Sequence, residues 1–181
     1  MLIRLLILCF VYFLPYVAAA QQKTLPALKI NQSIKIDGNL DDAAWKIAEP
    51  ISNFITISPV FGKPAKRISK VKLVYDNNAI YIGAYLYDNP STIRKQLTAR
   101  DMLDRQNVDI FTVGFDTYHD KQNAFIFRVS PANVQSDIKI SQSGAVYDHS
   151  WDAVWESKTS IKADGWVAEI KIPLSAIRFS K

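Results

Sequence analysis

The run IDGNLDDAAW, residues 36–45, places three carboxylates, a turn signal and a tryptophan within ten residues. Carboxylates so close together could bind a metal ion or transfer protons. The same residues also suit local roles, because Asp37 precedes a glycine in a turn and Asp41 or Asp42 can cap a short helix. We interpret the run as the beginning of the fold, with Trp45 reaching back into the core.

Other residue types give little support for catalysis. Glycoside hydrolysis needs two carboxylates at a fixed separation across a cleft, but Glu156 and Glu169 occupy outward-facing positions of expected strands. His119 and His149 lie in expected loops without metal-ligand spacing, and no serine or cysteine stands in a nucleophile motif. We therefore expect no catalytic residues. Two remote alternatives are glycoside hydrolase activity and the binding of haem between Met102 and a histidine.

The first twenty residues, 1–20, have the pattern of a secretion signal, in which Arg4 precedes an apolar run and alanines at 18–20 offer a cleavage position. An uncleaved membrane anchor is the alternative. We expect an exported protein that is periplasmic, outer-membrane-associated or extracellular, without nucleic-acid partners. Cys9, the only cysteine, lies in the apolar run, so the mature chain would lack thiol chemistry. The densest basic segment, 63–72, is interpreted as a solvated loop and strand edge.

Alternating apolar and polar residues dominate the rest of the chain and predict strands joined by short turns. After an N-terminal arm at 21–33, one domain covers 34–181, with a short helix ending at Ala48 and a helical turn at 173–177. The expected strands are 69–76, 79–88, 107–117, 123–130, 133–141, 155–163 and 165–173. This order predicts an all-β fold, an antiparallel β-sandwich of immunoglobulin-like or jelly-roll type with one short N-terminal helix.

Four segments in this order carry a family resemblance: IDGNLDDAAW, VKLVYDNNAIYIGAYLYD, NVDIFTVGFD and GWVAEIKIPLSAIRF. Together they resemble the family 9 carbohydrate-binding module, in the version at the N-terminus of exported Bacteroidetes proteins that continue into a β-barrel-like region. The resemblance covers Ile34 to Phe179. It implies a β-sandwich that binds oligo- or polysaccharide without catalysis, in proteins linked to xylan or cellulose breakdown by a fused or partner hydrolase. It also implies that further C-terminal strands follow Lys181 in the family, so that this chain is truncated.

The resemblance assigns sugar-binding roles to particular positions. Asp88, Asp109 and Arg128 match the family's acids and arginine that bind sugar hydroxyls, whereas Leu103 stands where the family has its first stacking tryptophan. The residues alone leave alternatives open: Asp109 and Arg128 could form a structural ion pair, and Asp88 could cap a turn. Trp151 has polar neighbours and is the best remaining aromatic platform for a sugar ring. For the other tryptophans of the mature domain, Trp45, Trp155 and Trp166, we expect core positions.

Two further expectations concern ligands other than sugar. The resemblance allows a structural calcium ion, for which the loops offer Asp116, Asp120 and Asp137 as oxygen ligands without a spaced motif. No other cofactor is expected. The alternative to sugar binding is a structural or accessory domain of an outer-membrane barrel protein, with no sugar ligand.

Overall fold

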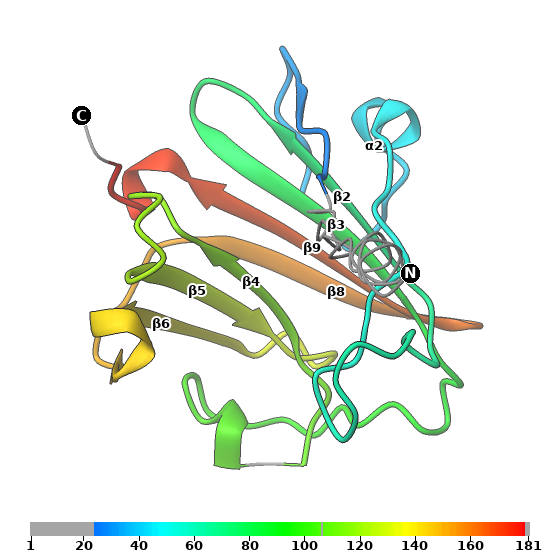
Figure 1. Ribbon diagram of the computed structural model, residues 1–181. Helices are drawn as coiled ribbons and strands as arrows, with labels where there is room; N and C mark the ends of the chain where they lie inside the picture. The colour runs from blue at the N-terminus through cyan, green and yellow to red at the C-terminus, as the bar shows by residue number, and fades with distance from the viewer. Residues whose placement is uncertain (1–23, 106, 180–181) are drawn as a thin grey trace, which may run out of the picture.

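Two β-sheets form the molecule, which we describe from a computed structural model over residues 24–105 and 107–179 (Figure 1). The expected leader, 1–20, lies outside the described residues. The strands of the larger sheet, in spatial order, are β1 (Leu28–Lys29), β2 (Ser69–Tyr75), β3 (Ala79–Tyr87), β9 (Gly165–Pro173) and β8 (Glu156–Lys162). Those of the smaller sheet are β4 (Phe111–Phe115), β5 (Ala124–Val129), β6 (Gln135–Ser141) and β7 (Val146–Asp148).

The helical elements within residues 24–105 and 107–179 are short. They are α2 (Ala43–Ile47) and the 3₁₀ turns η1 (Leu103–Arg105), η2 (Gln142–Gly144) and η3 (Leu174–Ala176). The described part of the chain has no helix with the length and apolar character needed to cross a membrane. The expected β-sandwich with one short helix is therefore confirmed. β1, which lies in the N-terminal arm, pairs with β2 in parallel, whereas the other strand pairs of the described residues are antiparallel.

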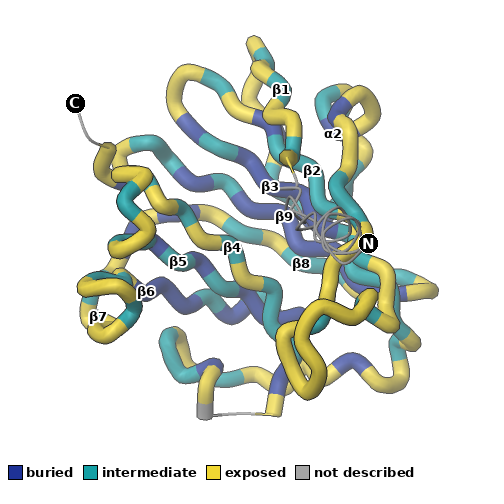
Figure 2. Tube along the Cα trace, viewed as in Figure 1, coloured by how far each residue is buried: buried dark blue, intermediate teal, exposed yellow. Residues whose placement is uncertain are grey.

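The main core lies between the two sheets. Alternate residues of β3, β5 and β9 point into it. In Figure 2, β5 alternates between buried and half-buried positions, whereas β9 is buried at most of its positions. Phe127, Trp155 and Trp166 are all buried there, with exposed fractions of 0%, 6% and 4%. The two tryptophans thus occupy the expected core positions.

A second core covers the outer face of the larger sheet, where the segment 36–48 packs over β3 and β9. Trp45 is fully buried in it, as expected. A Cβ at Gly83 would lie only 2.7 Å from the Leu40 side chain and 3.3 Å from the Trp45 ring, so any larger residue there would displace the Leu40 side chain. Asp42 is the N-cap residue of α2, but its side chain makes no capping hydrogen bond, and the expected capping role is wrong in that detail.

Glu169 corrects a prediction from the strand pattern. Alternation puts it on the outer face of β9, but its side chain is fully buried because the segment 36–48 covers it. The carboxylate accepts hydrogen bonds from the backbone N–H groups of Asp37 and Gly38 and from Nε1 of Trp45, each at 2.9 Å. The run IDGNLDDAAW is therefore tied to β9 through its backbone and its tryptophan.

Candidate functional site

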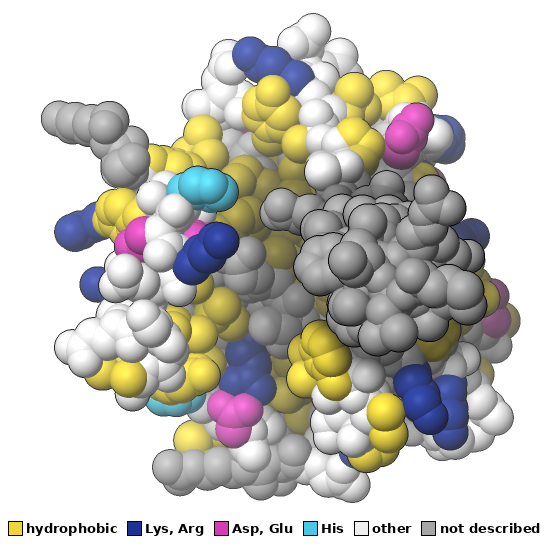
Figure 3. Space-filling model, in the orientation of Figure 1, with side chains coloured by type: hydrophobic (Ala, Val, Ile, Leu, Met, Phe, Trp, Pro, Cys, Tyr) yellow, Lys and Arg dark blue, Asp and Glu magenta, His cyan; other side chains and the backbone are white. Residues whose placement is uncertain are grey.

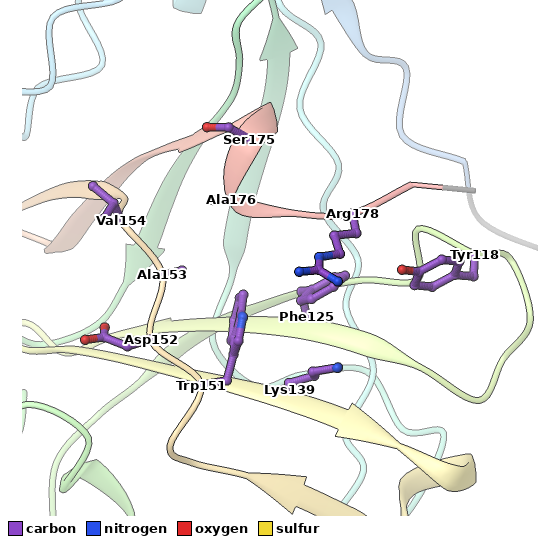
Figure 4. A pocket seen from close by; sticks show the side chains of 10 residues that line it. All are labelled: Tyr118, Phe125, Lys139, Trp151, Asp152, Ala153, Val154, Ser175, Ala176 and Arg178. Atoms are coloured by element: carbon purple, nitrogen blue, oxygen red, sulfur yellow. The ribbon is translucent and has the colours of Figure 1, made fainter. Parts of the chain in front are cut away.

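Trp151 lies in the segment between β7 and β8 and is half-buried against the smaller sheet. Its ring centroid is 5.0 Å from that of Phe125 and 5.8 Å from that of Phe127. The exposed part of the indole borders a pocket of about 440 Å³, shown in Figure 4. The side chains around the indole that bear on ligand chemistry are Tyr118, Phe125, Lys139, Asp152 and Arg178.

Two cations face this pocket. Figure 4 shows the guanidinium of Arg178 and the ammonium of Lys139 on the same side of Trp151 as Tyr118, whereas the carboxylate of Asp152 lies on the other side of the indole. Within residues 24–105 and 107–179, neither cation has a side-chain hydrogen bond or ion pair. The pocket therefore combines an aromatic wall with hydrogen-bond donors that are free to bind a polar ligand.

A buried carboxylate holds the Trp151 segment in place. Asp137 on β6 is fully buried and accepts hydrogen bonds from the backbone N–H of Ala153 at 2.5 Å and from Nε1 of Trp155 at 3.4 Å. Arg100 contacts Asp137 at 2.6 Å and Asp152 at 2.9 Å, so it bridges β6 to the residue after Trp151. Burial raises the pKa of Asp137, against the opposing effects of these hydrogen bonds and of Arg100. Arg100 and Asp137 are positioning residues for the aromatic wall.

Asp88 and Asp109, which the resemblance assigned to sugar binding, line a different pocket of about 300 Å³ beside Trp166. Asp88 is paired with Nε of Arg67 at 2.7 Å and accepts the backbone N–H of Asn89 at 2.7 Å, contacts that agree with the alternative of a turn cap. Arg94 donates to Asp109 from both its backbone N–H and its guanidinium, at 2.6–3.0 Å. Both carboxylates are thus already engaged by arginines that the sequence did not single out.

Arg128 lies apart from those acids. Side chains along β5 point to alternate faces of the smaller sheet, and Phe125 and Phe127 point into the core. Arg128 therefore points to the outer face of that sheet. It forms two hydrogen bonds to Asp104, at 2.5 and 2.6 Å, and this contact holds the pKa of Asp104 below its ordinary value. The alternative in which Arg128 pairs with Asp109 is therefore wrong.

Leu103, at the family's first stacking position, is only 1% exposed and packs in a small cluster with Val108 and Val134. A buried leucine cannot stack on a sugar ring, so this position offers no aromatic platform for a sugar near Arg128. Of the predicted sugar-binding residues, the structure brings Asp88 and Asp109 together and leaves Arg128 and Trp151 at separate places.

The three metal candidates do not form one site. Asp116 accepts backbone N–H groups of Asp120 and Lys121 in the β4–β5 loop, and Asp120 in turn accepts those of Gln122 and Asn123. Asp137 belongs to the buried Arg100 network. The described residues contain no group of three or more His, Cys, Asp or Glu side chains that could hold a metal ion.

A two-layer β-sandwich with an aromatic-walled, solvent-open pocket is the architecture of a small binding domain rather than of a cleft with paired catalytic acids. The sequence model of the family "Carbohydrate family 9 binding domain-like" matches residues 36–181, and the chain belongs to that family. The match covers most of the chain and includes the candidate residues.

Solved structures share the fold. A family 9 carbohydrate-binding module from Caldicellulosiruptor kristjanssonii in complex with cellotriose is 22% identical over 82% of this chain and 67% of that chain, with a TM-score of 0.53. The module from the same organism in complex with glucose is 22% identical over 83% of this chain and 70% of that chain, with a TM-score of 0.55. No curated protein matches the chain.

Proposed function

We propose that this chain binds oligosaccharides without catalysis, at the pocket beside Trp151. Family membership supports the ligand class, and structures of similar fold hold cellotriose and glucose. The observation that carries the proposal is the combination of an aromatic wall and unpaired donors in one pocket.

The chemistry of the pocket matches that of a sugar. The apolar C–H face of a pyranose packs against an aromatic ring, which Trp151 offers. Neighbouring hydroxyls accept paired hydrogen bonds from a planar guanidinium such as that of Arg178, and Lys139 adds a further donor. The volume of about 440 Å³ lies in the range of small-molecule sites. The pocket is open to solvent and buries little ligand area, so we expect a Kd of about micromolar to millimolar.

Replacing Arg178 by alanine is expected to weaken oligosaccharide binding by roughly tenfold or more, because charge-assisted hydrogen bonds to the ligand are lost. Trp151→Ala should have an effect of at least that size, with some loss of stability because its ring also packs on Phe125. Affinity electrophoresis in gels containing soluble cellulose or xylan derivatives measures both. Arg178 is exposed, so its replacement should leave the melting temperature unchanged.

Arg128→Ala is the matched control, since it removes a guanidinium outside the pocket. Loss of binding in this variant, with Arg178→Ala binding like the wild type, would move the site to the outer face of the smaller sheet. If the wild type binds no polysaccharide, the sugar-binding proposal fails. The buried Leu103 would then favour the accessory role without a sugar ligand.

We further propose that the domain works outside the cytoplasm, in an exported protein that serves xylan or cellulose breakdown and continues into a barrel region. The apolar run at 1–20 and the family resemblance support this proposal. Export is tested by the mass of the protein secreted from a Gram-negative host. A mature chain that begins at Gln21 would agree with export and cleavage of the leader, whereas a full-length chain that stays in the cytoplasm would contradict export.

A further inference from the structure

A loop between α2 and β2 exposes an unusual number of large apolar side chains. Ile57 and Phe61 are 81% and 76% exposed, and Phe54, Ile55 and Val60 beside them are 38–48% exposed. In Figure 3, hydrophobic side chains lie beside lysine or arginine side chains at the lower right, where Figure 1 places this loop. Single exposed apolar residues are ordinary, but such a cluster marks an interaction surface.

Hydrogen bonds close the loop on itself, so the apolar side chains are presented on a defined turn. The backbone N–H of Thr56 donates to the carbonyl of Lys63 at 2.7 Å, and that of Gly62 donates to Thr56 at 2.9 Å. The hydroxyl of Thr56 donates to the carbonyl of Val60 at 2.5 Å. The N–H of Ala65 donates to Phe54 at 2.9 Å and closes the base. The exposed tip therefore owes its shape to its own backbone, not to packing against the sandwich.

The charge around the loop has one sign. Between Glu49 and Asp76 the sequence contains five Lys or Arg residues and no Asp or Glu. Arg67 is paired with Asp88. The side chains of Lys63 and Lys66 are exposed, and their ammonium groups have no hydrogen bond or ion pair among the described residues. The loop thus carries apolar side chains at its tip and lysines at its base, and this pattern is complementary to an anionic lipid surface. On such a surface apolar side chains enter the headgroup boundary, and lysines contact the phosphate groups.

We infer that the loop 54–66, here called the apolar loop, docks this domain on anionic lipid membranes. The charge argues against a second copy as the occupant, because two copies would bring their lysines together. The inference does not depend on sugar binding, because the apolar loop and the Trp151 pocket share no residue.

The test is co-sedimentation of the protein, purified after export without the expected leader, with lipid vesicles. Vesicles of equal parts phosphatidylglycerol and phosphatidylcholine should bind it, and vesicles of phosphatidylcholine alone should bind it far more weakly. The double variant Ile57→Asp/Phe61→Asp should lose roughly tenfold or more in affinity. Lys63→Gln and Lys66→Gln should each cost about fivefold, and less at high salt.

Tyr147→Asp is the matched control, because Tyr147 is 57% exposed and lies on β7 of the other sheet. This variant should bind vesicles as well as the wild type does. Unchanged melting temperatures would show that each variant is folded. Equal binding of wild type to both vesicle types, no binding to either, or full binding by the Asp double variant would overturn the inference. Self-association that the double variant abolishes, without vesicle binding by the wild type, would also overturn it and identify a second copy as the occupant.

Discussion

Replacement of Glu169 by alanine is expected to lower the free energy of unfolding by about 3–5 kcal/mol, because three buried donors lose their acceptor at once. These donors are the backbone N–H groups of Asp37 and Gly38 and the indole N–H of Trp45. Chemical denaturation followed by tryptophan fluorescence measures the loss. The matched control is Glu156→Ala, whose exposed carboxylate pairs with Lys171 at the surface. This control should cost less than about 1 kcal/mol. Equal losses in the two variants would contradict the role given to Glu169.

The pH dependence of stability provides a second test at Glu169. Burial raises its pKa above the ordinary value of 4.5. A carboxyl group with a higher pKa in the folded state than in the unfolded state contributes most to stability at low pH. That contribution falls as the pH rises from the unfolded pKa through the folded pKa. The loss caused by Glu169→Gln should therefore be larger near about pH 4 than near about pH 7. If the stability lost in Glu169→Gln instead grows as the pH rises, the three hydrogen-bond donors outweigh burial and lower the pKa of Glu169.

Replacement of Arg100 by alanine should lower the free energy of unfolding by about 3 kcal/mol, because Asp137 would keep a buried charge without a cation. Arg100 is partly exposed while Asp137 is fully buried, and two N–H donors to Asp137 would remain. Loss of the contact to Asp152 should also free the segment that carries Trp151, so oligosaccharide affinity should fall.

Denaturation curves and affinity gels of Arg100→Ala measure these two effects. Arg128→Ala is the control, since its partner Asp104 is 55% exposed and can be hydrated after the substitution. Lower pH should partly restore the stability of Arg100→Ala, because Asp137 has a raised pKa and its protonated form needs no cation. Equal losses of stability in the two arginine variants would contradict a buried charge at Asp137.

Local patterns were sufficient to predict most of the fold. Alternation in residues 69–88 and the Asp164-Gly165 turn predicted the hairpins β2–β3 and β8–β9, which the structure contains. Gly165 also fits the structure for a reason that the sequence does not show, since a Cβ there would lie 2.2 Å from the carbonyl oxygen of Leu86. β7 was not predicted, because its three residues are too few to show alternation.

The contacts of the candidate residues could not be predicted, because each depends on segments far apart in the chain. The strand pattern placed Glu169 on an outer face, and only folding of the N-terminal segment over that face buries it. Arg128 pairs with Asp104, 24 residues away, rather than with the acid of the adjacent strand segment. Trp151 was recognised from its polar neighbours, but Arg178 and Lys139 join it from separate elements and carried no local signal.

The most direct test of the proposed sugar site is an NMR titration with cellotriose that follows the indole N–H resonances of the four tryptophans. The indoles of Trp45 and Trp155 are buried and bonded to carboxylates, whereas Trp151 borders the pocket. We expect one saturable shift, assigned to Trp151 by its absence in Trp151→Phe. The resonances of the other three tryptophans should stay in place. A saturable shift of Trp166 instead, which borders the Asp88 and Asp109 pocket, or no shift at all would contradict the account.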